Sequence, residues 1–509
     1  MPPYSRLAAV IAATFIIITA SGGAGAQESP APAASAAPIR PERSVSTHHT
    51  IAVRGGQIAY TATAGTLLVR DANEAPIGSF FYVAYTKDGE NHNTRPLTFL
   101  YNGGPGSSTM WLHMGSLGPK HVLTPDGEIT GPAPYQLVDN PDTLLDRSDL
   151  VFIDAMGTGY SRIVGKGTPK MFYGIDEDGA AFTKFVRRYI TQNDRWNSPK
   201  FLFGESYGTT RSAVLAADLD DAGISLSGVT LLSTVLDFNT LSPSLGEDIA
   251  YVGFLPTQAA VAWYHNKIPN KPASLAAFVA SAKQFAAGEY AQALLRGDTL
   301  GESERRSIAA KLSGFIGIDQ TYILNADLRV SPDRFEKELL RSEHRTIGRL
   351  DGRFEGYDVD SAGETPEYDP TNSVITDAFT GAFNRYVRDD LKYVADIDYL
   401  PTSYAVVNAG WNFKRSGADW SAPSVVDDLR RAMTRNPHLR VFSANGYFDL
   451  ATPFFATDYT LEHLGIPPAI AAHISYGYYE SGHMVYLHPQ ALAALHHDLE
   501  GFYDTALTR

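Results

Sequence analysis

One serine, Ser206, lies in a glycine-flanked turn between a short apolar run and a helical pattern. The run Lys-Phe-Leu-Phe at residues 200–203 is typical of a buried strand, and residues 213–219 have helical spacing. The turn between them reads Gly-Glu-Ser-Tyr-Gly (residues 204–208). An ordinary turn rich in Gly and Ser matches this pentapeptide too. Between a strand and a helix, however, it predicts a nucleophile elbow, in which the glycines let the chain turn sharply and expose the serine hydroxyl.

Two other predicted strands also run directly into glycine-rich loops. The strand at residues 97–101 is followed by Asn-Gly-Gly-Pro-Gly-Ser-Ser (102–108), and the strand at 150–154 by Gly-Thr-Gly-Tyr-Ser (157–161). Strands that alternate with helices predict a parallel sheet, with the site formed by loops at the strands' carboxyl ends. We therefore predict an α/β protein with the α/β-hydrolase fold, in which helices flank a mostly parallel central sheet.

The patterns along the chain divide it into five predicted segments. Residues 1–26 combine Arg6, a short apolar run and Ala-Gly-Ala before Gln27, as in an export signal, so we expect a periplasmic or secreted protein. Residues 27–47 are rich in Ala, Pro and Ser and predict a disordered tether. Residues 48–235 and 402–509 are expected to form the hydrolase core. Residues 236–401, where strands are scarce and helical patterns recur, are expected to form an inserted, mainly helical cap.

Composition excludes several classes of function. The net charge of −14 would repel nucleic acid and anionic membrane surfaces. The apolar run near the N-terminus is short for a membrane span, so no stable membrane insertion is expected after signal cleavage. The chain has no cysteine, which rules out a thiol nucleophile, and no His-Glu-x-x-His motif. We expect neither a metal nor a cofactor. The acidic residues 358–363 faintly resemble a calcium-binding loop, but we expect them to form a solvated loop.

Three dispersed residues complete a candidate catalytic triad. A serine needs a base to take its proton, and that base needs an acid to orient it and to stabilise its charged form. Asp449 follows the predicted strand at 439–444, and His483 follows the predicted strand at 473–478. The order Ser206, Asp449, His483 is that of α/β-hydrolases. Taken singly, the aspartate also suits a turn and the histidine an ordinary loop.

These motifs together resemble the serine carboxypeptidase family, peptidase family S10. The resemblance covers nearly the whole chain after the export signal, and the lack of cysteine suggests a bacterial branch. It rests on the following matches, in family order: Asn102-Gly103-Gly104-Pro105-Gly106-x-Ser108, Gly157-Thr158-Gly159-Tyr160-Ser161, Gly204-Glu205-Ser206-Tyr207, Gly446-x-x-Asp449 and Gly482-His483-Met484.

The resemblance implies a role for each matched position. It makes Ser206, Asp449 and His483 the catalytic triad, and the amides of Gly104 and Tyr207 the oxyanion hole. It also implies that the substrate's terminal carboxylate is bound by the three residues Asn102, Gly103 and Glu205.

The chain departs from the family at a position that matters for this binding. In the family, the counterpart of Glu205 shares a proton with a second glutamate, and here that position is Ser116. Without the pair, an ionised Glu205 would repel an incoming carboxylate. Either Asn102 and the Gly103 amide then recognise the carboxylate alone, or a cap residue supplies a cation.

We expect an exported serine carboxypeptidase that acts on peptides through an acyl-enzyme on Ser206. Three alternatives stay open. An aminopeptidase of the proline iminopeptidase type shares the Gly-Gly-Pro-Gly loop, the triad order and a helical cap, but usually has His in place of Asn102. An esterase or acyltransferase can use the same fold. A silent binding protein is a weaker alternative, because it would have no reason to retain three dispersed polar residues.

Overall fold

The computed structural model describes residues 37–416 and 423–508. The expected export signal and the first part of the expected tether lie outside these residues. A mixed sheet of ten strands forms the centre of the fold. Nine strands lie in the order β1 (Ser44–Val53), β2 (Gly56–Arg70), β3 (Pro76–Lys87), β7 (Asp149–Ile153), β4 (Leu97–Tyr101), β9 (Lys200–Glu205), β10 (Gly228–Leu232), β13 (Arg440–Gly446) and β14 (Ile474–Tyr479), and β8 (Arg162–Ile163) pairs with β3.

The sheet changes character at β7. Strands β1, β2, β3 and β7 pair antiparallel, whereas the strands from β7 through β4, β9, β10 and β13 to β14 are all parallel. Loops after parallel strands emerge at the same edge of a sheet. The loops that carry the predicted site residues, after β4, β9, β13 and β14, are therefore neighbours.

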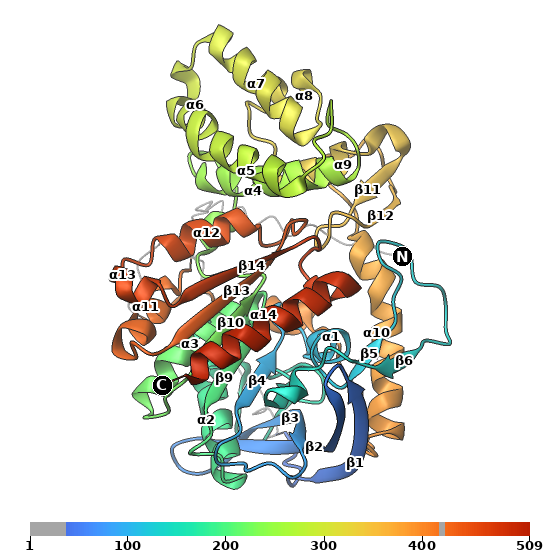
Figure 1. The fold of residues 1–509 in the computed structure, drawn as a ribbon, viewed down its shortest axis with the longest axis vertical. Coiled ribbons are helices and arrows are strands. Elements are labelled where there is room, and N and C mark those ends of the chain that lie inside the picture. Colours follow the sequence, from blue (N-terminus) through green and yellow to red (C-terminus); the bar gives the residue numbers. More distant parts are fainter. Residues whose placement is uncertain (1–36, 417–422, 509) are drawn as a thin grey trace, which may run out of the picture. The chain divides into compact units, whose positions relative to one another are not determined.

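Helices cover both faces of this sheet (Figure 1). Side chains alternate between the faces: Leu100 and Phe203 belong to one hydrophobic cluster, and Phe99 and Leu202 to the other. The first cluster includes residues of α1 (Met110–Gly115), α10 (Pro370–Asp389) and α14 (Pro489–Leu507); the second includes residues of α2 (Ile175–Gln192), α3 (Tyr207–Asp221), α11 (Val426–Arg435) and α12 (Phe454–Glu462).

The chain between β10 and α10 forms a further group of helices with its own hydrophobic cluster (Figure 1). That cluster also includes Phe448, Leu450 and Phe454 of the core. The cap elements are α4 (Ile249–Tyr264), α5 (Leu275–Phe285), α6 (Ala291–Arg296), α7 (Glu302–Ile316), α8 (Gln320–Asn325), α9 (Pro332–Glu338) and the short pair β11 (Arg345–Ile347) and β12 (Glu355–Tyr357). Smaller core elements are β5 (Lys120–Val122), β6 (Leu137–Asp139) and α13 (Pro468–Ala471).

Two predicted segment boundaries differ from the structure. The expected tether ends at residue 47, but β1 begins at Ser44 and pairs with β2 along its whole length. Its polar side chains stay largely exposed, so backbone pairing at the sheet edge, and not burial, stabilises this strand. Helix α10 lies within the expected cap but packs on the core, where Phe379 contacts the ring of Trp111.

The acidic loop at residues 358–363 is also not wholly solvated as expected. The side chains of Asp358 and Lys337 are both fully shielded from solvent and form an ion pair of 2.5 Å, which Glu367 joins at 3.1 Å. An isolated buried ammonium is costly, so these carboxylates are needed to neutralise it.

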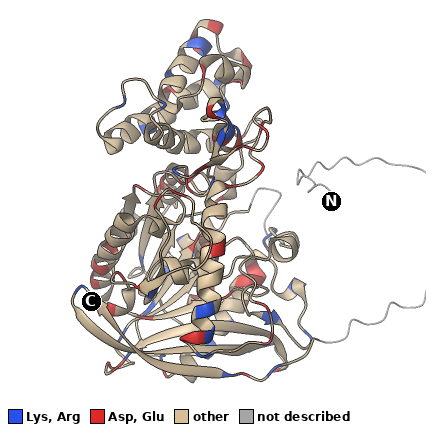
Figure 2. Ribbon diagram, turned by 90° about the vertical axis from the view of Figure 1, so that its right-hand side faces the viewer, with Lys and Arg blue, Asp and Glu red and all other residues tan. Residues whose placement is uncertain are grey.

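Charge elsewhere is spread over the molecule. Acidic and basic residues are interspersed over core and cap (Figure 2). Within residues 37–416 and 423–508, no helix is both long enough and apolar enough to cross a bilayer.

Candidate active site

Ser206 occupies a strained turn between β9 and α3. Its φ of 60° and ψ of −129° lie in a region that residues with a side chain rarely adopt. The flanking glycines permit the turn, since a Cβ at Gly204 would lie 2.1 Å from the carbonyl oxygen of Gly208. The predicted elbow is therefore present, and the serine is only partly buried.

Asp449 and His483 come from the loops after β13 and β14 and meet in the interior. Nδ1 of His483 donates to Oδ2 of Asp449 at 2.8 Å, and both side chains are almost fully buried. The other carboxylate oxygen accepts from the amides of Ala451 and Thr452, and the Thr452 hydroxyl donates to Oδ2 at 2.6 Å. These donors hold the carboxylate in one orientation, so it can orient the imidazole.

The hydrogen bond to Asp449 also sets the protonation of His483. With Nδ1 as the donor, Nε2 is left free to accept a proton. Burial alone lowers the pKa of His483, but the charge and hydrogen bond of Asp449 outweigh it, so the net pKa is raised above its ordinary value. The imidazole is thus suited to accept a proton from a neighbouring hydroxyl.

The glycine loop after β4 lies against the start of α3. A Cβ at Gly103 would be 2.4 Å from the amide nitrogen of Tyr207, and Gly104 has φ +108°, where glycine is favoured. Within the described chain, neither the Gly104 amide nor the Tyr207 amide donates to a carbonyl of another element or loop. Two N–H groups are therefore free beside Ser206, as an oxyanion hole requires.

Glu205 is buried directly behind the serine. Oε2 accepts from the hydroxyl of Tyr486 at 2.9 Å. Burial raises the pKa of Glu205 to about 7, although His483 and hydrogen bonds from Tyr486 and Asn102 oppose the rise. Ser116 is fully buried and donates its hydroxyl to the backbone, so Glu205 is paired with a phenol and not with a second carboxyl.

A cavity of about 340 Å³ joins these groups. Of the predicted site residues, it is lined by Asn102, Gly104, Glu205, Ser206, Tyr207 and His483. Asp449 lies behind His483, and Gly103 lies behind the loop, against the backbone of α3. The structure therefore brings the whole predicted set together.

A cap segment at residues 348–353 fastens the loops that carry Asp449 and His483. The carbonyl of Arg349 accepts from the amide of Leu450, and the carbonyl of Leu350 accepts from the amide of His483. The carboxylate of Asp351 accepts from the amide of Gly482 at 3.0 Å, and it pairs with Arg353 in a buried ion pair of 2.7 Å. No motif in the sequence indicated this connection.

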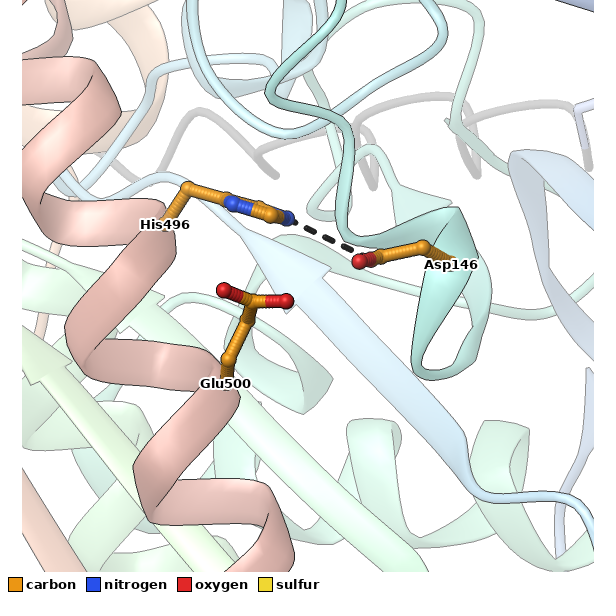
Figure 3. Close-up of side chains that lie close together, drawn as sticks. All are labelled: Asp146, His496 and Glu500. Atoms are coloured by element: carbon orange, nitrogen blue, oxygen red, sulfur yellow. Dashed lines mark hydrogen bonds and ion pairs between the residues drawn. The ribbon is translucent and has the colours of Figure 1, made fainter. Parts of the chain in front are cut away.

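Only one cluster of the described residues offers three ligand atoms for a metal ion, and it is remote from this cavity. It consists of Asp146, His496 and Glu500, whose ligand atoms lie within 4.8 Å of one another (Figure 3). Glu500 already pairs with Arg147 at 2.7 Å, and this guanidinium lowers the pKa of Glu500. The cluster is an ion-pair network with its own cation.

Comparison with known proteins places the chain in a family. Residues 64–472, well over half of the chain, match the family model described as serine carboxypeptidase. The chain belongs to the serine carboxypeptidase family. It is a serine-type carboxypeptidase, and peptide substrates fit an enzyme of this type. The matched range ends before His483, so the placement of that residue comes from the structure.

One solved structure similar to the carboxypeptidase shares its fold. Kex1Δp, a prohormone-processing carboxypeptidase from Saccharomyces cerevisiae, is 17% identical with a TM-score of 0.57, over 87% of this chain and 91% of that chain. A proline iminopeptidase from Mycobacterium smegmatis is 12% identical with a TM-score of 0.33, over 87% and 99% of the two chains. No curated protein sequence matches the chain. The likeness to Kex1Δp confirms the predicted α/β-hydrolase fold.

Gly482 of the carboxypeptidase provides a test of the cap segment's role. A Cβ at this position would lie 2.4 Å from Cβ of Asp351. Gly482→Ala should therefore displace the loop that carries His483. Because a misplacement of about 1 Å can cost roughly 100-fold in rate, we expect kcat to fall by about 10- to 100-fold.

Steady-state kinetics on a peptide substrate, with a thermal unfolding curve for each variant, will measure this effect. Gly501→Ala is the matched control, because nothing lies within 4 Å of a Cβ there. A folded Gly482→Ala variant with undiminished kcat would show that the contact with Asp351 does not position His483.

Proposed function

We propose that the chain is exported and then releases C-terminal residues from peptides through an acyl-enzyme on Ser206. The observation that carries this proposal is the hydrogen bond of His483 Nδ1 to Asp449, with the imidazole and Ser206 lining one cavity. The family supports the reaction type, and the geometry supports the residues.

In the proposed reaction, the hydroxyl of Ser206 attacks the carbonyl of the last peptide bond. Nε2 of His483 takes the hydroxyl proton, and Asp449 stabilises the resulting imidazolium. The negative oxygen of the tetrahedral intermediate accepts from the amides of Gly104 and Tyr207. The C–N bond then breaks, and the leaving amine takes the proton from His483. Water repeats these steps on the acyl-enzyme and restores Ser206.

The proposal also assigns recognition of the terminal carboxylate to the groups around Glu205. With a pKa of about 7, Glu205 is largely protonated in mild acid and can donate a hydrogen bond to a carboxylate. Asn102 lines the same cavity, and Gly103 follows it in the same loop. The same triad would serve an aminopeptidase, an esterase or an acyltransferase, so the test must distinguish these reactions.

We expect the purified protein to shorten an unmodified peptide and its N-acetylated form from the C-terminus, and to spare the C-amidated form. Mass spectrometry of the products distinguishes the alternatives, because an aminopeptidase would be blocked by acetylation. Ser206→Ala and His483→Ala should each lower turnover by about 10⁴-fold or more, as in other triads.

A fluorophosphonate probe that labels wild type but not Ser206→Ala will identify the nucleophile. Ser281→Ala is a control, since Ser281 is exposed on α5 and does not line the cavity. Peptide hydrolysis that survives in Ser206→Ala would eliminate the proposed mechanism.

Tyr486→Phe should shift the pH dependence of peptide hydrolysis. The hydroxyl of Tyr486 donates to Glu205 and lowers its pKa, so removing it should raise that pKa above about 7. Glu205 then stays neutral to higher pH, and repulsion of the terminal carboxylate begins later. We expect the high-pH limb of kcat/KM for free peptides to move upward.

The measurement is a pH profile on the free peptide, with Glu205→Gln as a variant that never ionises. His483 and Asp449 also act on Glu205, but both variants leave these residues in place. Tyr290→Phe removes a buried hydroxyl in the cap and should leave the profile unchanged. A limb that stays in place in both Tyr486→Phe and Glu205→Gln would show that Glu205 does not control it.

Export predicts a mature chain that begins at or near Gln27 and is found outside the cytoplasm. N-terminal sequencing after expression in a bacterial host, with separate cytoplasmic, periplasmic and medium fractions, will test this. Recovery of a chain that retains residues 1–26 in the cytoplasm would contradict export while leaving the catalytic proposal intact.

A further inference from the structure

We propose that Arg349, from the cap, binds the terminal carboxylate of the substrate and so creates the preference for free C-termini. This inference rests on the proposed function and names the residue that supplies its specificity. The missing second glutamate leaves the site in need of such a cation, and Arg349 lies where one is needed.

Arg349 lines the cavity together with Ser206, His483 and Glu205. Its backbone is held in place, because its carbonyl accepts from the amide of Leu450, next to Asp449. The following residue, Leu350, accepts from the amide of His483 and donates to Asp369. The guanidinium thus belongs to a segment that is bonded to the loops of both Asp449 and His483.

The guanidinium of Arg349 has no partner among the described residues. Its side chain is exposed and forms no ion pair or hydrogen bond within residues 37–416 and 423–508. The same segment offers a contrast, since the guanidinium of Arg353 is almost fully buried and pairs with both Asp351 and Asp126. An arginine without a carboxylate partner at a peptidase cavity is suited to bind a carboxylate from the substrate.

Two acidic residues interact with the charge of Arg349, but neither pairs with its guanidinium. Glu336 and Asp369 both interact with its charge, and burial raises the pKa of each above its ordinary value. In the described chain, neither carboxyl forms an ion pair or a hydrogen bond with the guanidinium. The guanidinium therefore has no carboxylate partner of its own among the described residues.

The charge of Arg349 can offset the repulsion between an ionised Glu205 and the terminal carboxylate of the substrate. A lone carboxyl with a pKa of about 7 is increasingly ionised toward neutral pH and then repels a carboxylate. A guanidinium keeps its charge throughout this range, so it can attract the substrate when Glu205 no longer donates a hydrogen bond. The same positive charge disfavours a peptide's N-terminal ammonium, which separates this site from that of an aminopeptidase.

Two substrates with the same acyl group isolate the interaction. From an N-acylated dipeptide the leaving group is an amino acid that carries the terminal carboxylate. From the matching N-acyl amino acid methyl ester the leaving group is methanol, which has no carboxylate. Arg349→Gln should lower kcat/KM for the dipeptide by about 10- to 100-fold, the loss expected for one charge-assisted hydrogen bond, and change that for the ester by less than about 3-fold. Arg349→Lys should recover part of the difference.

Arg306→Gln is the matched control, because this cap arginine is exposed on α7 and does not line the cavity. Equal losses on the two substrates in Arg349→Gln, or no loss on either, would overturn the inference. A thermal unfolding curve for each variant shows whether a loss of kcat/KM comes from misfolding. If Arg349→Gln is misfolded, Arg349→Lys is compared with wild type on the two substrates instead.

Binding separates this inference from the proposed function. In a Ser206→Ala background, calorimetry should show tighter binding of a free peptide than of its amide, and Arg349→Gln should remove that difference. If the difference is present but wild type hydrolyses neither substrate, the proposed function fails and the inference stands. If wild type hydrolyses both and the binding difference persists in Arg349→Gln, the inference alone fails.

Discussion

The close approach of two backbone segments at the end of β9 is the constraint on which the site depends. Ser206 adopts a conformation of positive φ, which costs on the order of 1–3 kcal/mol and persists only where its surroundings enforce it. The surroundings here are backbone atoms: Gly204 faces the carbonyl of Gly208, and Gly103 faces the amide of Tyr207. Any larger residue at either glycine would separate the serine from the amides beside it.

Around this turn, the parallel part of the sheet and the cap both position the catalytic triad. Successive parallel strands place the loops of Ser206, Asp449 and His483 at one edge, which is a consequence of topology alone. Topology does not orient an imidazole, however. That requires the donors around Asp449 and the cap segment whose carbonyl accepts from the amide of His483. The rigid core brings the residues near one another, and the insertion completes their alignment.

The sequence predicted those features that are local, and missed those that depend on distant contacts. The strand ends, the elbow and the order of Ser206, Asp449 and His483 could be read because glycine spacing and apolar runs report local conformation. Tyr486 follows the predicted His483 closely, but nothing in the sequence indicates that its hydroxyl donates to Glu205. Arg349 could not be predicted either, because no motif surrounds it and only the fold brings it to the cavity. For the same reason, the partners of Asp358 were missed: Lys337 is close only in space. The first residues of β1 were assigned to the tether because pairing with β2, and not an apolar face, stabilises them.

The fastening of the catalytic loops by residues 348–353 limits how this enzyme can be rebuilt. An insertion that touched the core only at its two ends could be exchanged between relatives as a module. Here the amides of Gly482 and His483 find their acceptors within the insertion itself. A chimera that took a foreign cap would leave those donors unpaired unless it kept this segment. A chimera should therefore replace only part of the insertion and keep residues 348–353 from this chain.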